Sequence, residues 1–150
     1  MTDPAIRRVG VALKTTSPDA VELGRQLVAE LDRLGIEAVI DRETAEVLES
    51  KTDIEREHLA SVVDLIVVIG GDGTLLSVTR GVLGGTPILG INMGTLGFLT
   101  EHPADRLLPV LHAALEGRVE IVRRERLTVT VENPNKEKIT RCVLNDAVIN

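Results

Sequence analysis

The sequence predicts an α/β fold in which a doubly wound, mostly parallel sheet is followed by antiparallel strands. Three observations lead to this fold class. Short apolar runs alternate with amphipathic stretches up to Gly117, in the order β, α, β, β, α, β, α. The run at residues 65–69 is continuously apolar, which is typical of a parallel strand covered on both faces. Beyond Gly117, charged and apolar residues alternate, and this pattern favours antiparallel pairing.

Local signals justify the elements in turn. Ser17 can cap a helix whose first position suits Pro18, and Gly35 follows the last periodic residue of that helix. Residues 41–60 are polar and weakly periodic, so we expect a loop there with no more than one irregular helical turn. Strands are expected at residues 6–13, 36–40, 65–69 and 87–91, and helices at residues 20–34, 74–82 and 103–115. This order is that of a Rossmann-like sheet.

The change of pattern after Gly117 predicts two domains. Residues 1–118 would form the α/β domain, and residues 119–150 would form antiparallel strands that begin a second, β-rich domain. Within the latter, Asn133-Pro134-Asn135 is a turn between two strand-like segments. The chain stops inside the last of these segments with no cap or polar tail, so we expect the second domain to be incomplete.

Composition argues against several classes of partner. The formal net charge is −6 and aromatic residues make up 1% of the chain, so it lacks the basic surface and the stacking platforms that bind nucleic acids. No apolar run approaches the roughly 18 residues of a membrane span. Cys142 is a single cysteine, and the three histidines lack metal-ligand spacing. We therefore expect a cytoplasmic protein with no nucleic-acid or membrane partner and no metal site of its own side chains.

A glycine-rich segment, GGDGT at residues 70–74, connects the predicted central strand to the next helix. This is the carboxyl edge, where open parallel sheets bind ligands. Its glycines would allow positive φ and a close approach to phosphate, and the N–H groups at the start of the helix favour an anion. Thr74 can cap that helix. A plain hairpin turn is the alternative, but the following residues are helical in pattern rather than alternating.

Asp72 is an unusual residue for a phosphate-binding loop, because its carboxylate repels the ligand. A carboxylate is useful there if it binds Mg²⁺ or accepts a proton from an attacking hydroxyl. Both uses imply phosphoryl transfer.

Two later segments offer further ligand contacts. In GINMGTLGFL, at residues 90–99, Asn92 offers an amide and Phe98 an apolar face for a base, although Phe98 taken alone is better explained as a core residue. Asn145 and Asp146 interrupt an apolar strand near the end of the chain. In a regular strand these two side chains point to opposite faces, so binding one ligand needs a bulge or a strand end. Solvated side chains on an edge strand are the alternative.

In this order and spacing, GGDGT, GINMGTLGFL and LNDAVIN closely resemble the NAD kinase family over nearly the whole chain. GGDGT is shared with diacylglycerol-type lipid kinases and phosphofructokinases, whereas GINMGTLGFL discriminates between these families. The resemblance implies an enzyme that transfers a phosphoryl group from ATP, or another donor, to the 2′-hydroxyl of NAD and so makes NADP. Mg²⁺ or another divalent cation would enter with the donor.

The resemblance also implies roles for residues of the nucleotide-binding domain. Asp72 would orient or deprotonate the 2′-hydroxyl of the adenosine ribose of NAD. Gly71, Gly73 and Thr74 would surround the phosphates, and Phe98 would flank the adenine pocket.

The remaining implications concern the C-terminal part of the chain. Asn145 and Asp146 would bind the adenosine part of NAD, and an Asp reaches less far than the Glu that other members carry. A second β-rich domain would complete the site and form homo-oligomers, so this chain alone is expected to be inactive. A GGDGT-type lipid or sugar kinase, or a non-catalytic nucleotide-binding or assembly module, are the alternatives.

Overall fold

The computed structural model describes residues 6–82, 84–95 and 97–144. The chain divides into two compact units, Met1–Glu120 and Ile121–Asn150. The first contains a parallel sheet with helices on its faces and the second an antiparallel pair of strands, so the predicted fold class is confirmed. Among the described residues, no helix has both the length and the apolar character needed to cross a membrane.

The sheet of the first unit has the order β2-β1-β3-β4-β5 and all of its pairings are parallel. Its strands are β1 (Arg8–Leu13), β2 (Glu37–Ile40), β3 (Leu65–Gly70), β4 (Ile88–Asn92) and β5 (His102–Pro103). Every residue of β3 is buried between β1 and β4, as its unbroken apolar run predicts. Because the chain leaves β1 toward β2 and then returns to the other side of β1 as β3, the winding direction reverses between β1 and β3.

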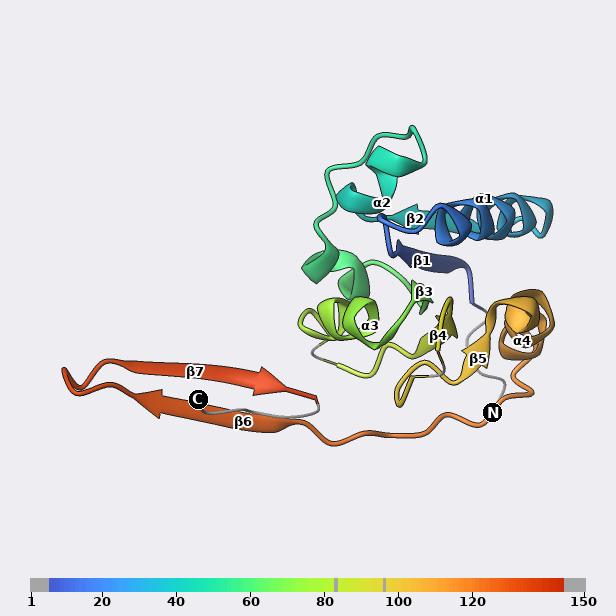
Figure 1. Ribbon diagram of the computed structural model, residues 1–150. Helices are drawn as coiled ribbons and strands as arrows, with labels where there is room; N and C mark the ends of the chain where they lie inside the picture. Colours follow the sequence, from blue (N-terminus) through green and yellow to red (C-terminus); the bar gives the residue numbers. More distant parts are fainter. Residues whose placement is uncertain (1–5, 83, 96, 145–150) are drawn as a thin grey trace. The chain divides into compact units, whose positions relative to one another are not determined.

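Helices cover both faces of this sheet (Figure 1). The α-helices are α1 (Pro18–Arg33), α2 (Arg42–Val47), α3 (Asp72–Thr79) and α4 (Leu107–Leu115), and the 3₁₀-helices are η1 (Arg56–Ser61) and η2 (Ala104–Arg106). The predicted ends of α1 are confirmed, since the Ser17 hydroxyl accepts a hydrogen bond from the Ala20 N–H and Gly35 follows with a φ of 70°.

Side-chain alternation along β1 separates the two faces. Val9, Val11 and Leu13 belong to the main core, together with residues of α1 and α4. The opposite face packs against η1 and α3, and a Cβ added at Gly10 would lie 3.0 Å from Leu59 Cγ. In Figure 1, α1 and α4 accordingly lie on one side of the sheet and α3 on the other.

The segment 41–60 departs from the sequence prediction, because it contains a true helix, α2, as well as η1. Asp41 caps α2 by accepting a 2.7 Å hydrogen bond from the Thr44 N–H, and both residues are fully buried. Part of the polar character that favours a loop here is therefore internal, because Asp41 and Thr44 bond each other inside the protein.

Two helix starts also differ from the prediction. Helix α3 begins at Asp72 rather than Thr74, since Gly71 is its extended N-cap residue and provides no side chain. Helix α4 begins at Leu107 rather than at residue 103, because Pro103 pairs with Asn92 in the sheet and the 3₁₀ turn η2 follows. Pro109 then falls in the first turn, where its missing N–H costs no hydrogen bond.

The second unit is a two-stranded antiparallel hairpin formed by β6 (Leu127–Glu132) and β7 (Lys138–Val143). The Asn133 carboxamide oxygen accepts hydrogen bonds from the N–H groups of Asn135 and Glu137, and Lys136 has a φ of 64° at the turn. Most side chains of the hairpin are exposed, including the apolar Leu127, Val131 and Ile139.

Candidate functional site

Three strand ends meet at the carboxyl edge of the sheet, next to the point where its winding reverses. Gly70 ends β3 and pairs with Asn92, which ends β4, and Met93 donates a 2.7 Å backbone hydrogen bond to the Gly70 carbonyl. On the other side of β3, the Lys14 N–H donates to the Ile69 carbonyl at 2.8 Å. Ligands of doubly wound sheets bind in this crevice, at the carboxyl ends of the strands that flank the reversal.

The Asp72 carboxylate is the centre of the site and accepts four hydrogen bonds. Its Oδ2 accepts from the Phe98 N–H at 2.8 Å. Its Oδ1 accepts from the N–H groups of Leu99 (3.1 Å) and Thr100 (3.0 Å) and from the Thr100 hydroxyl (3.1 Å). The Thr100 hydroxyl in turn accepts a 2.8 Å hydrogen bond from Asn92 Nδ2. We call these groups and their bonds the Asp72 network; it joins the GGDGT segment to residues 92–100.

The pKa of Asp72 lies below its ordinary value. Burial of the carboxyl, the largest single effect, raises the pKa, but the hydrogen bonds from the N–H groups of Phe98, Thr100 and Leu99 and from the Thr100 hydroxyl together outweigh it. Asp72 is therefore ionised at neutral pH. All of its bonded donors are uncharged, so the carboxylate keeps its full negative charge.

Glycines contribute to the site in ways that differ from the prediction. None of Gly70, Gly71 and Gly73 has a positive φ, and Gly71 is extended. A Cβ at Gly71 or Gly73 would meet nothing within 4 Å, so both leave open space beside the N-terminus of α3. Gly97 is different, because a Cβ there would lie only 2.2 Å from Asp72 Oδ1. The absence of a side chain at Gly97 is what allows the carboxylate to approach the 98–100 backbone.

Three other predicted site residues have environments that the sequence does not reveal. Thr74 lies inside α3 and does not cap it, and its Oγ1 would be 2.5 Å from a Cβ at Gly70. Asn92 is buried, and its amide bonds internally to the Thr100 hydroxyl and the Gly94 N–H. Phe98 is 74% exposed, which overturns its interpretation as core and places its ring at the surface. Asn145 and Asp146 lie outside the described residues.

Two residues at this edge were missed by reasoning from the sequence. Thr100 is fully buried and bonds directly to Asp72, but it follows the recognised segment and carries no signal of its own. Lys14 is exposed at the end of β1, and its Cβ lies 3.0 Å from a Cβ built on Gly70. The available signal for Lys14 was its position directly after the first strand, at the carboxyl edge where doubly wound sheets bind ligands.

A second polar cluster, the Asp41 network, lies under the same edge. Arg56 Nε donates a 2.7 Å hydrogen bond to Asp41 Oδ2, and its Nη2 donates to the Leu13 carbonyl at 3.3 Å. Its Nη1 donates to Ser77 Oγ on α3 at 3.2 Å and pairs with Glu43 at 3.0 Å. The Arg56 side chain is only 10% exposed and Asp41 is fully buried. This network connects the end of β1 with α2 and α3.

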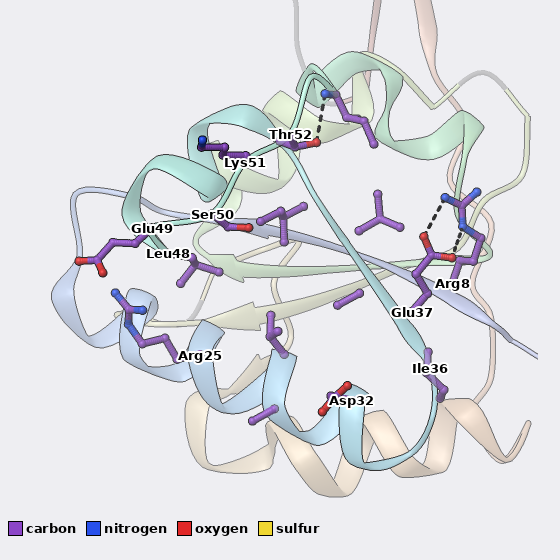
Figure 2. A pocket seen from close by; sticks show the side chains of 16 residues that line it. Arg8, Arg25, Asp32, Ile36, Glu37, Leu48, Glu49, Ser50, Lys51 and Thr52 are labelled. Atoms are coloured by element: carbon purple, nitrogen blue, oxygen red, sulfur yellow. Dashed lines mark hydrogen bonds and ion pairs between the residues drawn. The ribbon is translucent and has the colours of Figure 1, made fainter.

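A groove of about 960 Å³ lies elsewhere, along the edge strand β2. Figure 2 shows the Arg8–Glu37 ion pair at one end of the groove and Arg25 and Glu49 at the other. Its walls come from α1, β2 and residues 48–54 and include no predicted site residue. The predicted site residues that the structure describes therefore lie at the carboxyl edge and not in this groove.

Within the described residues, no group of three or more His, Cys, Asp or Glu side chains could bind a metal ion. Asp72 brings one carboxylate to the site, and its Oδ1 accepts three of the four hydrogen bonds to that carboxylate. Mg²⁺ is commonly bound by one or two carboxylates together with the phosphates of a substrate. These residues fit a cation that arrives with a phosphorylated ligand rather than a resident one.

Residues 9–119 match the family described as the ATP-NAD kinase N-terminal domain. Among curated proteins, the chain is 37% identical to an NAD kinase of Geobacter sulfurreducens and 40% identical to one of Syntrophotalea carbinolica. Each comparison covers 97% of this chain and about half of the relative, 51% and 52% respectively. The chain thus spans about half the length of the curated relatives that it matches.

Two solved structures are also similar to the chain. One is a crystal structure of yeast NADH kinase complexed with NADH, with a TM-score of 0.79 and 20% sequence identity. The superposition covers 95% of this chain and 48% of the yeast chain, and it supports the fold. An NAD kinase from Archaeoglobus fulgidus in complex with ATP has a TM-score of 0.61 at 27% identity, and covers 86% of this chain and 44% of its own.

Proposed function

The chain belongs to the family of ATP-NAD kinase N-terminal domains, and from this premise we propose that it provides the nucleotide-binding part of an NAD kinase. The reaction is phosphoryl transfer from ATP, or another donor, to the 2′-hydroxyl of NAD. One observation carries the proposal. Asp72 is ionised, accepts hydrogen bonds from neutral donors, and lies beside open glycine positions at the carboxyl edge of a parallel sheet.

Asp72 accepts the hydrogen bond, and then the proton, of the attacking 2′-hydroxyl. A lowered pKa makes the carboxylate a weak base, so its main contribution is to orient the hydroxyl and to take up its proton during the transfer. The hydroxyl oxygen bonds to the transferred phosphorus as the bond from that phosphorus to the bridging oxygen of the donor breaks, and the shortened donor leaves with the electron pair of that bond. The negative charge also repels the phosphates. Catalysis of phosphoryl transfer is largely positioning plus neutralisation of charge, which a divalent cation bound to the donor supplies.

The remaining residues bind the two substrates. Gly71, Gly73 and Thr74 surround the phosphates at the start of α3, where a Cβ at either glycine position would occupy space that is open. Lys14 adds a positive charge on the β1 side of the same crevice. The exposed ring of Phe98 flanks the adenine.

Residues beyond the described ranges, and partners, belong to the same proposal. Asn145 and Asp146 bind the adenosine part of NAD, as family resemblance implies. Asn92 acts here through its internal bonds rather than by direct contact with the nucleotide. We also propose that the natural protein is a cytoplasmic homo-oligomer, and the exposed apolar side chains of the β6–β7 hairpin support an assembly that covers them.

The test is a substrate panel with the natural protein that carries this sequence. Thermal shift is measured with NAD, NADP, ATP and sugar phosphates, each with and without Mg²⁺, because a ligand of the native state stabilises it by about 2.7 kcal/mol at 100 times Kd. NADP formation from NAD and ATP is then measured directly. Stabilisation by NAD together with NADP formation is the expected result. Phosphorylation of a lipid or a sugar without NADP would identify one of the other GGDGT kinases, and stabilisation by nucleotides without turnover would identify a binding module.

A further inference from the structure

The Asp72 carboxylate is bonded unequally at its two oxygens. Oδ1 accepts three hydrogen bonds, from the N–H groups of Leu99 and Thr100 and from the Thr100 hydroxyl. Oδ2 accepts one, from the Phe98 N–H. A carboxylate oxygen has two lone pairs, so Oδ1 is saturated while Oδ2 can accept one more bond.

The Thr100 hydroxyl is itself fixed in direction. It has one proton, which it donates to Asp72 Oδ1, and it accepts a hydrogen bond from Asn92 Nδ2 at 2.8 Å. Asn92 is held by the Gly94 N–H, which donates to its Oδ1 at 2.7 Å, and by its pairing with Gly70 in the sheet. This gives an ordered chain of donors from the amide of Asn92 through the hydroxyl of Thr100 to the carboxylate of Asp72.

Burial excludes solvent from the Asn92 and Thr100 end of this chain of bonds. Thr100 is fully buried and Asn92 is 5% exposed. Linked hydrogen bonds in such surroundings strengthen one another, and a buried group that loses its partner is costly. The Thr100 hydroxyl therefore cannot exchange its partner for water.

We propose that Thr100, oriented by Asn92, is a positioning residue that turns Oδ1 of Asp72 toward the protein and leaves Oδ2 as the oxygen that accepts the substrate hydroxyl. This inference rests on the proposed function, because it assigns an atom to the role of Asp72 in that reaction. Thr100 itself does not touch the substrate. It acts by fixing the rotation of the carboxylate.

The test compares three variants of the natural protein. Thr100→Val keeps the shape but removes the hydroxyl, and Thr100→Ser keeps the hydroxyl. Thr44→Val is the matched control: Thr44 is equally buried and its hydroxyl also bonds an internal partner, the Leu13 N–H at 3.1 Å, but it makes no contact with Asp72. Two quantities are measured for each protein, the pKa of the Asp72 carboxyl by carbon NMR titration and the steady-state kinetics of NADP formation.

Thr100→Val is expected to raise the pKa of Asp72 and to lower kcat by about 10- to 100-fold, since a misplaced catalytic group costs that much. KM for NAD should change by less than about threefold, because binding does not use the hydroxyl. Thr100→Ser should restore most of kcat and return the pKa of Asp72 toward the wild-type value. The inference is overturned if Thr100→Val leaves both quantities at their wild-type values, or if Thr44→Val reproduces its effects.

The wild-type protein provides a measurement that does not depend on activity or on variants. The buried Thr100 hydroxyl proton should be protected from exchange, and its NMR shift should follow the titration of Asp72. A hydroxyl proton that exchanges freely or is insensitive to Asp72 would overturn the proposal even if every variant unfolds. If wild-type protein forms no NADP but this coupling is observed, the proposed function fails while the positioning of Asp72 by Thr100 holds.

Discussion

Two aspartates near the carboxyl edge of one sheet carry out opposite tasks. Asp41 is fully buried and its carboxylate is paired with the guanidinium of Arg56, so its charge is neutralised inside the protein. Asp72 is only partly buried and is bonded to N–H and O–H groups that carry no charge. Both carboxylates are fixed in place, but only the second keeps a net charge that a ligand can experience.

The comparison indicates that the charge of its hydrogen-bonding partner determines whether a carboxylate serves structure or presents a charge to a ligand. Pairing with a cation fixes the position of a buried carboxylate and removes its electrostatic effect on anything nearby. Neutral donors fix the position as well and keep the charge, because they stabilise the ionised form without cancelling it. The Asp41 network therefore supports the strand and helix ends, and the Asp72 network holds a charged carboxylate at the sheet edge.

Replacement of Asp72 should have the largest effect of any single substitution at this edge of the sheet. Asp72→Asn keeps the size of the side chain and removes its charge, so kcat for NADP formation should fall by about 10²–10⁴-fold, the usual loss of a general base. Binding of NAD should survive or become tighter as repulsion of the phosphates decreases. Steady-state kinetics across a Mg²⁺ titration measure both effects. A kcat within about tenfold of wild type would reduce Asp72 to a structural residue, and rescue by Mg²⁺ would assign it to the metal.

Replacement of Asp41 should affect stability and not chemistry. Asp41→Asn removes the buried counter-ion of the Arg56 guanidinium and leaves it only the exposed Glu43, and breaking a buried ion pair typically costs about 3–5 kcal/mol. Urea denaturation measures the loss. Glu43→Gln is the control, because Glu43 pairs with the same arginine but is 62% exposed, and exposed pairs contribute about 0–1 kcal/mol. Equal losses in the two variants would contradict the distinction between buried and exposed partners of Arg56.

A methyl group at position 97 should disturb the Asp72 network specifically. Gly97→Ala places a Cβ 2.2 Å from Asp72 Oδ1, so the carboxylate or the 97–100 backbone must move, at a cost of about 1–3 kcal/mol. Gly94→Ala in the same segment meets nothing within 4 Å and should leave the stability unchanged or slightly higher. Thermal denaturation compares the two. Similar melting temperatures would show that the close approach at Gly97 is not needed.

The smallest expected effect is the loss of stability in acid. Folding lowers the pKa of Asp72 from its ordinary value of 3.8. The hydrogen bonds to the carboxylate therefore contribute their full stability above pH 3.8, and this contribution is lost as the pH falls from 3.8 through the lower pKa of the folded protein. The difference in unfolding free energy between wild type and Asp72→Asn should therefore shrink as the pH is lowered from about 5 to about 2. A difference that stays constant over this range would mean that Asp72 titrates normally.

The sequence was most informative where the pattern is local. The buried run of β3, the direct passage from that strand into a helix at GGDGT and the cap at Ser17 are all encoded by consecutive residues, and the structure confirms them. The Asp41 network could not be predicted because Arg56 lies 15 residues from Asp41, in a segment whose polar composition is that of a solvated loop.

The environment of the candidate site was less accessible for a different reason. The N–H donors to Asp72 belong to the main chain 26 to 28 residues later in the sequence. Because nearly every residue type has a main-chain N–H, the amino-acid sequence does not reveal which residues donate. The exposure of Phe98 was also hidden, since a single Phe in a chain with no other aromatic residue is expected in the core. Position 97 shows the same limit: its glycine is necessary only because a carboxylate distant in sequence lies against it.

The main-chain origin of those donors has a consequence for protein engineering. Three of the four hydrogen bonds to Asp72 come from peptide groups of residues 98–100, which every amino acid except proline supplies. The side chains at positions 98 and 99 can consequently be exchanged without altering the charge or the placement of the carboxylate. If the proposed roles of Phe98 and Asp72 hold, a library at these two positions would change the side chain offered to the ligand while the carboxylate stays constant, and ligand preference would then vary independently of reactivity.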